Sequence, residues 1–134
     1  MKDPEVTGVI IGGAIEVHRT LGPGLLESVY EECLAMELGL RGLRVQRQLP
    51  VALEYKGRRI GAELKIDLLV NDQVIVELKS VEHLLPIHDA QAITYLRLTG
   101  KPIGLLINFN VPLLKDGIRR FLNRSSSPCL RASV

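Results

Sequence analysis

LKIDLLVNDQVIVELK occupies residues 64–79 and sets two short apolar runs on either side of the polar segment 71–73. Each run has the length and side chains of a strand buried on both faces, and the polar segment has the length of a tight turn. The stretch therefore predicts an antiparallel hairpin inside a sheet. Asp67, Glu77 and Lys79 interrupt these runs, and an ionised group in a buried strand costs several kcal/mol unless it is paired or bound to a metal.

The length of the turn decides whether Asp67 lies beside Glu77. A two-residue loop of Asn71 and Asp72 pairs Asp67 with Val76, on the side away from Glu77. A three-residue loop pairs Asp67 with Glu77 directly, which we prefer because it also produces one wholly apolar face. A β-bulge could also bring Asp67 beside Glu77. The residues on that face would be Ile66, Leu68, Val70, Val74, Val76 and Leu78.

Two facing carboxylates repel each other unless positive charge lies between them. A hard divalent cation accepts oxygen ligands from Asp, Glu, a backbone carbonyl and water. Lys79 could instead form a buried ion pair with Asp67 and Glu77. The residues alone leave both interpretations open.

The flanking sequence supplies helices before this hairpin and a further helix and strand after it. A helix is predicted to start at Asp3-Pro4-Glu5 and to reach about residue 18. A second helix carries one apolar stripe, and Gly39 and Gly42 end it. That stripe comprises Leu26, Val29, Cys33, Met36 and Leu40. The remaining expected elements are a strand over 45–55 broken at Pro50, a turn at Lys56-Gly57, a helix over 87–99, a strand over 103–108 and a final helix over 113–122.

This order, ααβββαβα, predicts an α/β sandwich with a mixed central sheet. At 134 residues the chain fits one domain, which we expect to span residues 1–124, followed by a disordered tail over 125–134. No apolar run is long enough to span a membrane, and the amino terminus lacks the charge pattern of a secretion signal. These features favour a soluble, cytoplasmic protein without a membrane partner.

Composition excludes several classes of function. Two cysteines are too few for a disulfide scaffold or a four-ligand zinc site. The absence of Trp, with only three Tyr and two Phe, disfavours an aromatic platform for single-stranded nucleic acid. The net charge of +2 neither requires nor excludes a polyanion.

Basic residues nevertheless cluster in two stretches, which is the pattern that phosphate backbones require, although exposed faces also carry such residues for solubility. The first stretch contains Arg41, Arg44, Arg47, Lys56, Arg58 and Arg59, and the second contains Lys115, Arg119, Arg120, Arg124 and Arg131.

Several motifs in order resemble the GxxExxY proteins, a bacterial group within the PD-(D/E)xK nuclease superfamily. The naming motif is present at residues 24–30, and Gln91 and Tyr95 match a QxxxY element. Asp67 is followed, after nine residues, by Glu77-Leu78-Lys79. Residues 105–109 and 114–118 are also similar, so the resemblance runs from about residue 6 to residue 123. Ile66 stands where many members of the superfamily have proline.

The resemblance implies a restriction-endonuclease-like fold and assigns a role to each motif residue. Asp67, Glu77 and the Leu78 carbonyl would hold Mg²⁺, with Mn²⁺ as an alternative, and Glu27 would be a further ligand. Lys79 would orient the attacking water or stabilise charge on the phosphate. Gln91 would hydrogen-bond the water or phosphate, and Tyr30 and Tyr95 would support the site. Without the resemblance, Glu27 is a solvated helix residue, and Gln91 and Tyr95 form the polar side of an amphipathic helix.

The implied activity is Mg²⁺-dependent hydrolysis of phosphodiester bonds in nucleic acid, favouring DNA, with 5′-phosphate and 3′-hydroxyl products. The two basic stretches are the candidate backbone contacts. A homodimer is compatible with this fold, although the sequence shows no interface. The alternative from another class is a catalytically silent module of the same fold that binds nucleic acid or protein. Cleavage of RNA also stays open.

Overall fold

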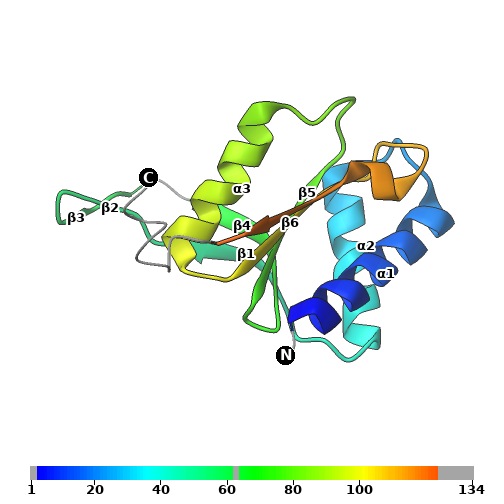
Figure 1. Ribbon diagram of the computed structural model, residues 1–134, viewed down its shortest axis with the longest axis horizontal. Helices are drawn as coiled ribbons and strands as arrows, with labels where there is room; N and C mark the ends of the chain where they lie inside the picture. Colours follow the sequence, from blue (N-terminus) through cyan, green and yellow to red (C-terminus); the bar gives the residue numbers. More distant parts are fainter. Residues whose placement is uncertain (1–2, 62–63, 124–134) are drawn as a thin grey trace.

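The computed structural model describes residues 3–61 and 64–123, which form a mixed sheet flanked by helices (Figure 1). The helices are α1 (Asp3–Leu21), α2 (Glu27–Leu40) and α3 (Pro86–Thr99), with a short 3-10 helix η1 (Leu114–Gly117). The strands are β1 (Val45–Val51), β2 (Glu54–Tyr55), β3 (Arg58–Arg59), β4 (Leu64–Val70), β5 (Val74–Lys79), β6 (Ile103–Asn108) and β7 (Ile118–Leu122).

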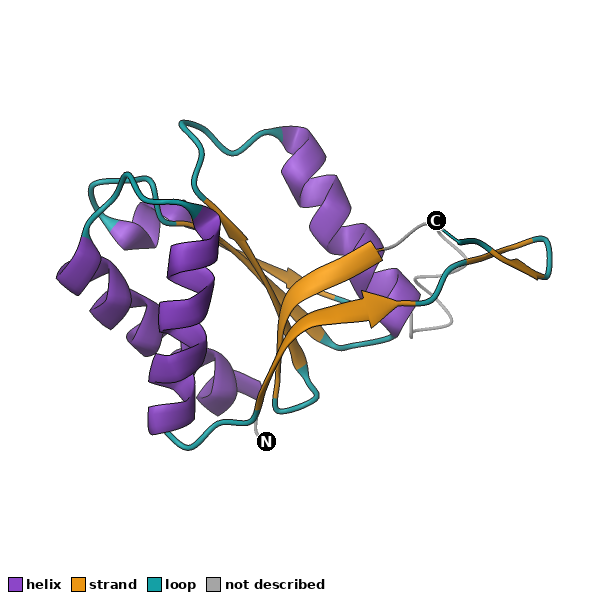
Figure 2. Cartoon of the chain, turned by 180° about the vertical axis from the view of Figure 1, so that it is seen from behind, coloured by secondary structure: helices purple, strands orange, loops and turns teal. Residues whose placement is uncertain are grey.

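Five strands form the central sheet in the order β1-β4-β5-β6-β7. β5 and β6 run parallel, whereas the other neighbours are antiparallel. A parallel pair needs a crossover, and α3 supplies it between β5 and β6. β2 and β3 pair only with each other and project from the body as a separate hairpin (Figures 1 and 2).

The sheet lies between two helical layers, with α1 and α2 on one face and α3 on the other (Figure 2). The larger core joins Ile10, Leu34 and Leu38 to inward side chains of β4, β5 and β6. The smaller core joins Tyr95 and Leu96 of α3 to the opposite face of the sheet. α1 and α2 approach closely at Gly13, where an added Cβ would lie 2.8 Å from a Leu38 methyl carbon. This α/β sandwich with a mixed sheet is the restriction-endonuclease-like fold that the sequence predicts.

The central hairpin adopts the three-residue register. Val70 pairs with Val74 and Leu68 with Val76, so Asp67 and Glu77 come next to each other at the following position. Ile66 differs from the prediction, because it packs against α3 with Leu69 instead of sharing the face of Leu68. The alternation of side chains between the two faces of the sheet is therefore interrupted at Asp67, as it is in a β-bulge.

The buried face of α2 is not the predicted stripe. Leu26, Met36 and Leu40 are exposed, and the helix buries Tyr30, Leu34 and Leu38 instead. Both sets have helical spacing, so periodicity could not separate them. Tyr30 can be buried because its ring stacks on Phe109 and its hydroxyl has two backbone partners. Cys33 is only partly buried.

The predicted final helix over 113–122 is wrong, because only Leu114–Gly117 is helical and Ile118–Leu122 forms strand β7. β7 pairs along β6 and covers an edge that would otherwise present unpaired backbone groups. Gly117 permits the entry into this strand, since an added Cβ would lie 2.3 Å from the Asn108 carbonyl oxygen. The predicted strand over 45–55 also divides, into β1 and β2.

The predicted tail at 125–134, with Cys129 and Arg131, and Arg124 before it, lies outside the described residues. Within the described ranges 3–61 and 64–123, no helix is both long enough and apolar enough to cross a membrane.

Candidate active site

Asp67 and Glu77 meet where the central hairpin loses its regular pairing. The Asp67 backbone N–H donates to Glu77 Oε2 at 3.2 Å, and the Leu78 N–H donates to Asp67 Oδ2 at 2.8 Å. Each strand therefore holds the carboxylate of the other through a main-chain donor. The arrangement fixes both carboxylates near the carboxyl end of β5.

β1 is distorted at the same level of the sheet. Arg47 and Leu49 pair with residues of β4, whereas Gln48 between them does not. The φ of Gln48 is +51°. The displaced Gln48 side chain donates from Nε2 to Glu31 Oε1 at 2.6 Å and to Asp67 Oδ1 at 3.3 Å. A positive φ is costly for glutamine, so the neighbouring structure must hold it there. The distortion aims an amide at the Asp67 carboxylate.

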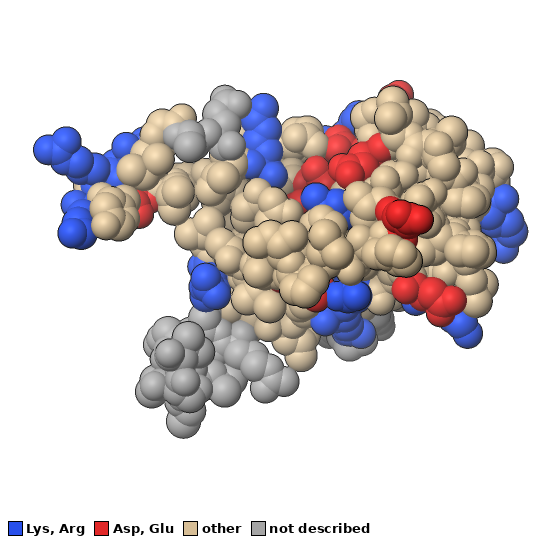
Figure 3. Space-filling model, turned by 90° about the horizontal axis from the view of Figure 1, so that it is seen from above, with Lys and Arg blue, Asp and Glu red and all other residues tan. Residues whose placement is uncertain are grey.

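α2 contributes two carboxyls one helical turn apart. Glu31 is buried and accepts a hydrogen bond from Arg47 Nε at 3.0 Å, whereas Glu27 is exposed at the first position of the helix. Both charges act on Asp67, whose pKa they raise. The site thus gathers acidic side chains from α2, β4 and β5, and Figure 3 shows acidic side chains grouped on the upper face of the molecule.

Burial and mutual repulsion destabilise the ionised forms of the central pair. Burial, followed by the charge of Asp67, raises the pKa of Glu77 from 4.5 to about 8. Burial also raises the pKa of Asp67, although the hydrogen bond from Leu78 opposes that shift. Lys79 lowers the pKa of Glu77 by its positive charge. An additional cation would stabilise the ionised forms of Asp67 and Glu77.

α3 closes the other side of the site with Tyr95 and Gln91. The Gln91 side chain is hydrogen-bonded to the Tyr95 hydroxyl, and the two share a helix face as their i, i+4 spacing predicts. Burial first, and then the charges of Glu77 and Asp67, raise the pKa of Tyr95. The helix therefore presents a polar pair to the carboxylates.

The GxxExxY segment builds the entry to α2. Gly24 has a φ of +97°, which favours glycine. The Tyr30 hydroxyl donates to the Gly22 carbonyl at 2.5 Å and accepts from the Leu25 N–H at 3.1 Å. Ser80 Oγ donates to the Leu25 carbonyl at 2.6 Å, which ties this loop to the end of β5. Tyr30 thus braces the loop that precedes Glu27 and lies away from the carboxylates.

Asn108 at the end of β6 braces the chain that follows β5. It is buried, it bonds both the N–H and the carbonyl of Val81, and it accepts from the Asn110 N–H. His18 is buried, with its Nε2 2.7 Å from the Val111 carbonyl oxygen. Neither side chain belongs to the carboxylate cluster.

The donor set has the chemistry that a hard divalent cation requires. Asp67 and Glu77 offer adjacent carboxylates, whose pKa values are raised first by burial and then by neighbouring negative charges. In the part of the chain that the structure describes, no group of three His, Cys, Asp or Glu side chains is positioned to hold a metal ion.

The predicted basic stretches do not form one surface. Arg41 pairs with Glu37, Arg47 with Glu31 and Arg119 with Asp89. The Arg44 backbone N–H donates to Asn71 Oδ1 at 2.8 Å, which places Arg44 beside the turn at the end of the hairpin away from Glu77. Lys115 and Arg120 are exposed on η1 and β7. Lys56, Arg58 and Arg59 lie on the projecting β2–β3 hairpin.

Sequence reasoning missed Glu31 and Gln48. Glu31 follows Glu27 by four residues, so helical spacing could have identified it as a neighbour of Glu27. The wrong choice of buried face on α2 hid that relation. No spacing in the sequence identifies Gln48, because its hydrogen bonds to Glu31 and Asp67 depend on a distorted backbone.

Carboxylates and a lysine at the end of a central strand, inside a mixed sheet flanked by helices, are the arrangement of restriction-endonuclease-like proteins. The family model for the PD-(D/E)XK nuclease superfamily matches residues 4–121, and the chain belongs to this superfamily. No curated protein and no solved structure matches it.

Proposed function

We propose that this protein is a GxxExxY-type nuclease that hydrolyses phosphodiester bonds in DNA with Mg²⁺, leaving 5′-phosphate and 3′-hydroxyl ends. The observation that carries the proposal is the pairing of half-buried Asp67 with buried Glu77, each held by a main-chain N–H of the opposite strand. A hairpin that needed only stability would not place half-buried Asp67 against buried Glu77, because the ionisation of both carboxyls is unfavourable there.

Asp67, Glu77 and the Leu78 carbonyl would hold the cation, with Glu27 as a further ligand through water. The bound cation would polarise the scissile phosphate and lower the pKa of the attacking water. Gln48 and the Leu78 N–H would fix the Asp67 carboxylate, because each donates to one of its oxygens. Mn²⁺ has the same preference for oxygen ligands and would substitute for Mg²⁺.

Lys79 would stabilise the negative charge that develops on the phosphate, and its electrostatic influence on Glu77 supports this position. Gln91 would hydrogen-bond the attacking water or a phosphate oxygen. Tyr95 would keep Gln91 in place through the hydrogen bond between their side chains. Tyr30 would act indirectly, because its hydroxyl holds the loop that precedes Glu27.

A panel of single-stranded, duplex and branched DNA and RNA tests the proposal, with Mg²⁺, Mn²⁺ or chelator in each reaction. We expect cleavage of DNA with either metal and none with chelator. Product ends are read by ligation, which requires a 5′-phosphate.

Chelator-resistant cleavage would contradict the metal mechanism, and cleavage confined to RNA would contradict the assignment to DNA. Binding without cleavage on every substrate would instead favour a catalytically silent module of the same fold.

A further inference from the structure

The β2–β3 hairpin, residues 54–59, forms an arm outside the two helical layers. Glu54 pairs with Arg59 and Tyr55 with Arg58, and the structure gives these strands no other partner among the described residues. Lys56 and Gly57 have φ values of +52° and +80°, which is the two-residue turn that keeps paired strands twisted together. The arm projects on the side away from α1 and α2 (Figures 1 and 2).

Stability of the fold does not account for this arm. An isolated two-stranded ribbon is marginal in water, and all its residues are exposed. Tyr55 is 64% exposed, and the Lys56 ammonium lies 5.5 Å from its ring centroid. A segment that contributes no core is available to contact a partner.

The charge on the arm identifies the kind of partner. Lys56, Arg58 and Arg59 make no ion pair with any acid among the described residues, and Glu54 is the arm's single acid. By contrast, Arg41, Arg47 and Arg119 each contact a carboxylate of the protein itself. The arm therefore offers cations that are free to neutralise phosphates.

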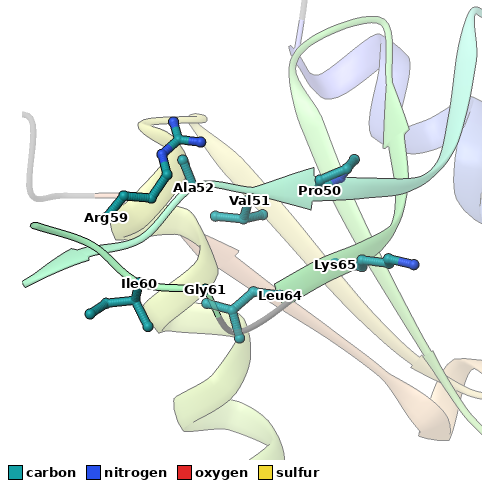
Figure 4. Close-up of a pocket in the computed structure, with 8 residues that line it drawn as sticks. All are labelled: Pro50, Val51, Ala52, Arg59, Ile60, Gly61, Leu64 and Lys65. Atoms are coloured by element: carbon teal, nitrogen blue, oxygen red, sulfur yellow. The ribbon is translucent and has the colours of Figure 1, made fainter.

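The groove at the base of the arm extends the basic surface toward the site. It has a volume of about 450 Å³, and Arg59 of β3 and Lys65 of β4 are among the residues that line it (Figure 4). Pro50, Ile60 and Leu64 supply its apolar wall. Lys65 precedes Asp67 by two residues on β4, so the groove adjoins the strand that carries this carboxylate.

We infer that the arm enters the major groove of duplex DNA and makes double-stranded, B-form DNA the substrate. This inference rests on the proposed function for the identity of the ligand. The major groove of B-form DNA admits a two-stranded ribbon, whereas the A-form groove of double-stranded RNA is too narrow for one. A single strand offers no groove, and the arm has only one aromatic ring on which a base could stack.

The length of the arm sets where it contacts DNA. Eight residues separate Gln48, beside the carboxylates, from Lys56 at the turn. At about 3.3 Å per residue they reach at most about 26 Å, which corresponds to about eight base pairs of B-form DNA. Arm contacts should therefore fall within about eight base pairs of the cleaved phosphate, on one side of it.

Binding in the presence of EDTA tests the inference without requiring cleavage. The proteins are the full chain, a triple variant with Lys56→Ala, Arg58→Ala and Arg59→Ala, and a matched variant with Arg19→Ala, Arg97→Ala and Lys101→Ala. The probes are a DNA duplex, the RNA duplex of the same sequence and each single strand. We expect the arm variant to bind the DNA duplex about tenfold more weakly and to lower the salt slope by about 3. The matched variant should stay close to the wild type.

Equal losses in both variants would show a general effect of charge and overturn the inference, as would no loss in the arm variant. An equal dependence on the arm for double-stranded RNA or single strands would overturn the assignment to B-form DNA. Because these results do not depend on catalysis, a protein that binds through the arm but never cleaves would contradict only the proposed function.

Discussion

Asp67→Asn should abolish Mg²⁺-dependent cleavage while leaving the protein folded. The amide keeps the size of the carboxylate and can still accept from the Leu78 N–H, but it removes the charge that would hold the cation. Loss of about 4 kcal/mol of transition-state stabilisation corresponds to about a thousandfold decrease in rate. The measurement is the rate of cleavage of the best substrate from the panel, together with the melting temperature.

Asp72→Asn is the matched control, because it makes the same substitution in the neighbouring turn. Asp72 is exposed and pairs with Lys101, far from Glu77 along β5. Cleavage should stay near the wild-type rate in this control. A clean Asp67→Asn preparation that still cleaves at more than about a tenth of the wild-type rate would exclude the proposed role of Asp67.

The metal-free protein should become less stable as the pH rises from about 4.5 to about 8. The pKa of Glu77 is 4.5 in the unfolded chain and about 8 in the native protein. Between these values the native protein holds a proton that the unfolded chain has released, so the free energy of unfolding falls as pH rises. The total loss should be on the order of 4 kcal/mol. The raised pKa of Asp67 adds a change of the same sign.

Glu77→Gln should remove most of this pH dependence, because the amide carries no proton that titrates. The variant should match the wild type near pH 5 and exceed its stability near pH 9, and it should not cleave. Urea denaturation in EDTA across this pH range measures the difference. Glu82→Gln, an exposed residue just beyond β5, should leave the wild-type curve unchanged. Parallel curves for Glu77→Gln and wild type would show that the Glu77 carboxyl is not the destabilising group.

The central hairpin was predictable because several local signals agree there. The apolar face favoured a three-residue turn over a two-residue turn, and the pairing of Val70 with Val74 confirms that register, although Ile66 lies on the other face. The helix over 87–99 and the strand over 103–108 were equally clear, since Pro86 and Gly100 mark their boundaries.

The features that sequence reasoning missed depend on tertiary contacts. β7 is a strand because β6 offers it an edge, although its isolated sequence suits a helix. α2 turns Tyr30 inward because Phe109, Gly22 and Leu25 accommodate its ring and hydroxyl. Gln48 reaches Asp67 only through its left-handed backbone conformation. None of these contacts follows the helical or strand period, so periodicity carries no information about them.

Direct titration of the metal-free protein with Mn²⁺, followed by calorimetry, tests most directly whether Asp67 and Glu77 share one divalent cation. At pH 8 the wild type should show saturable binding accompanied by proton release, because the Glu77 carboxyl is half protonated there. Asp67→Asn and Glu77→Gln should each abolish that binding, while Asp72→Asn should retain it. Equal binding by all four proteins, or none by the wild type at millimolar Mn²⁺, would contradict a shared cation and leave Lys79 as the counter-ion of a structural acid pair.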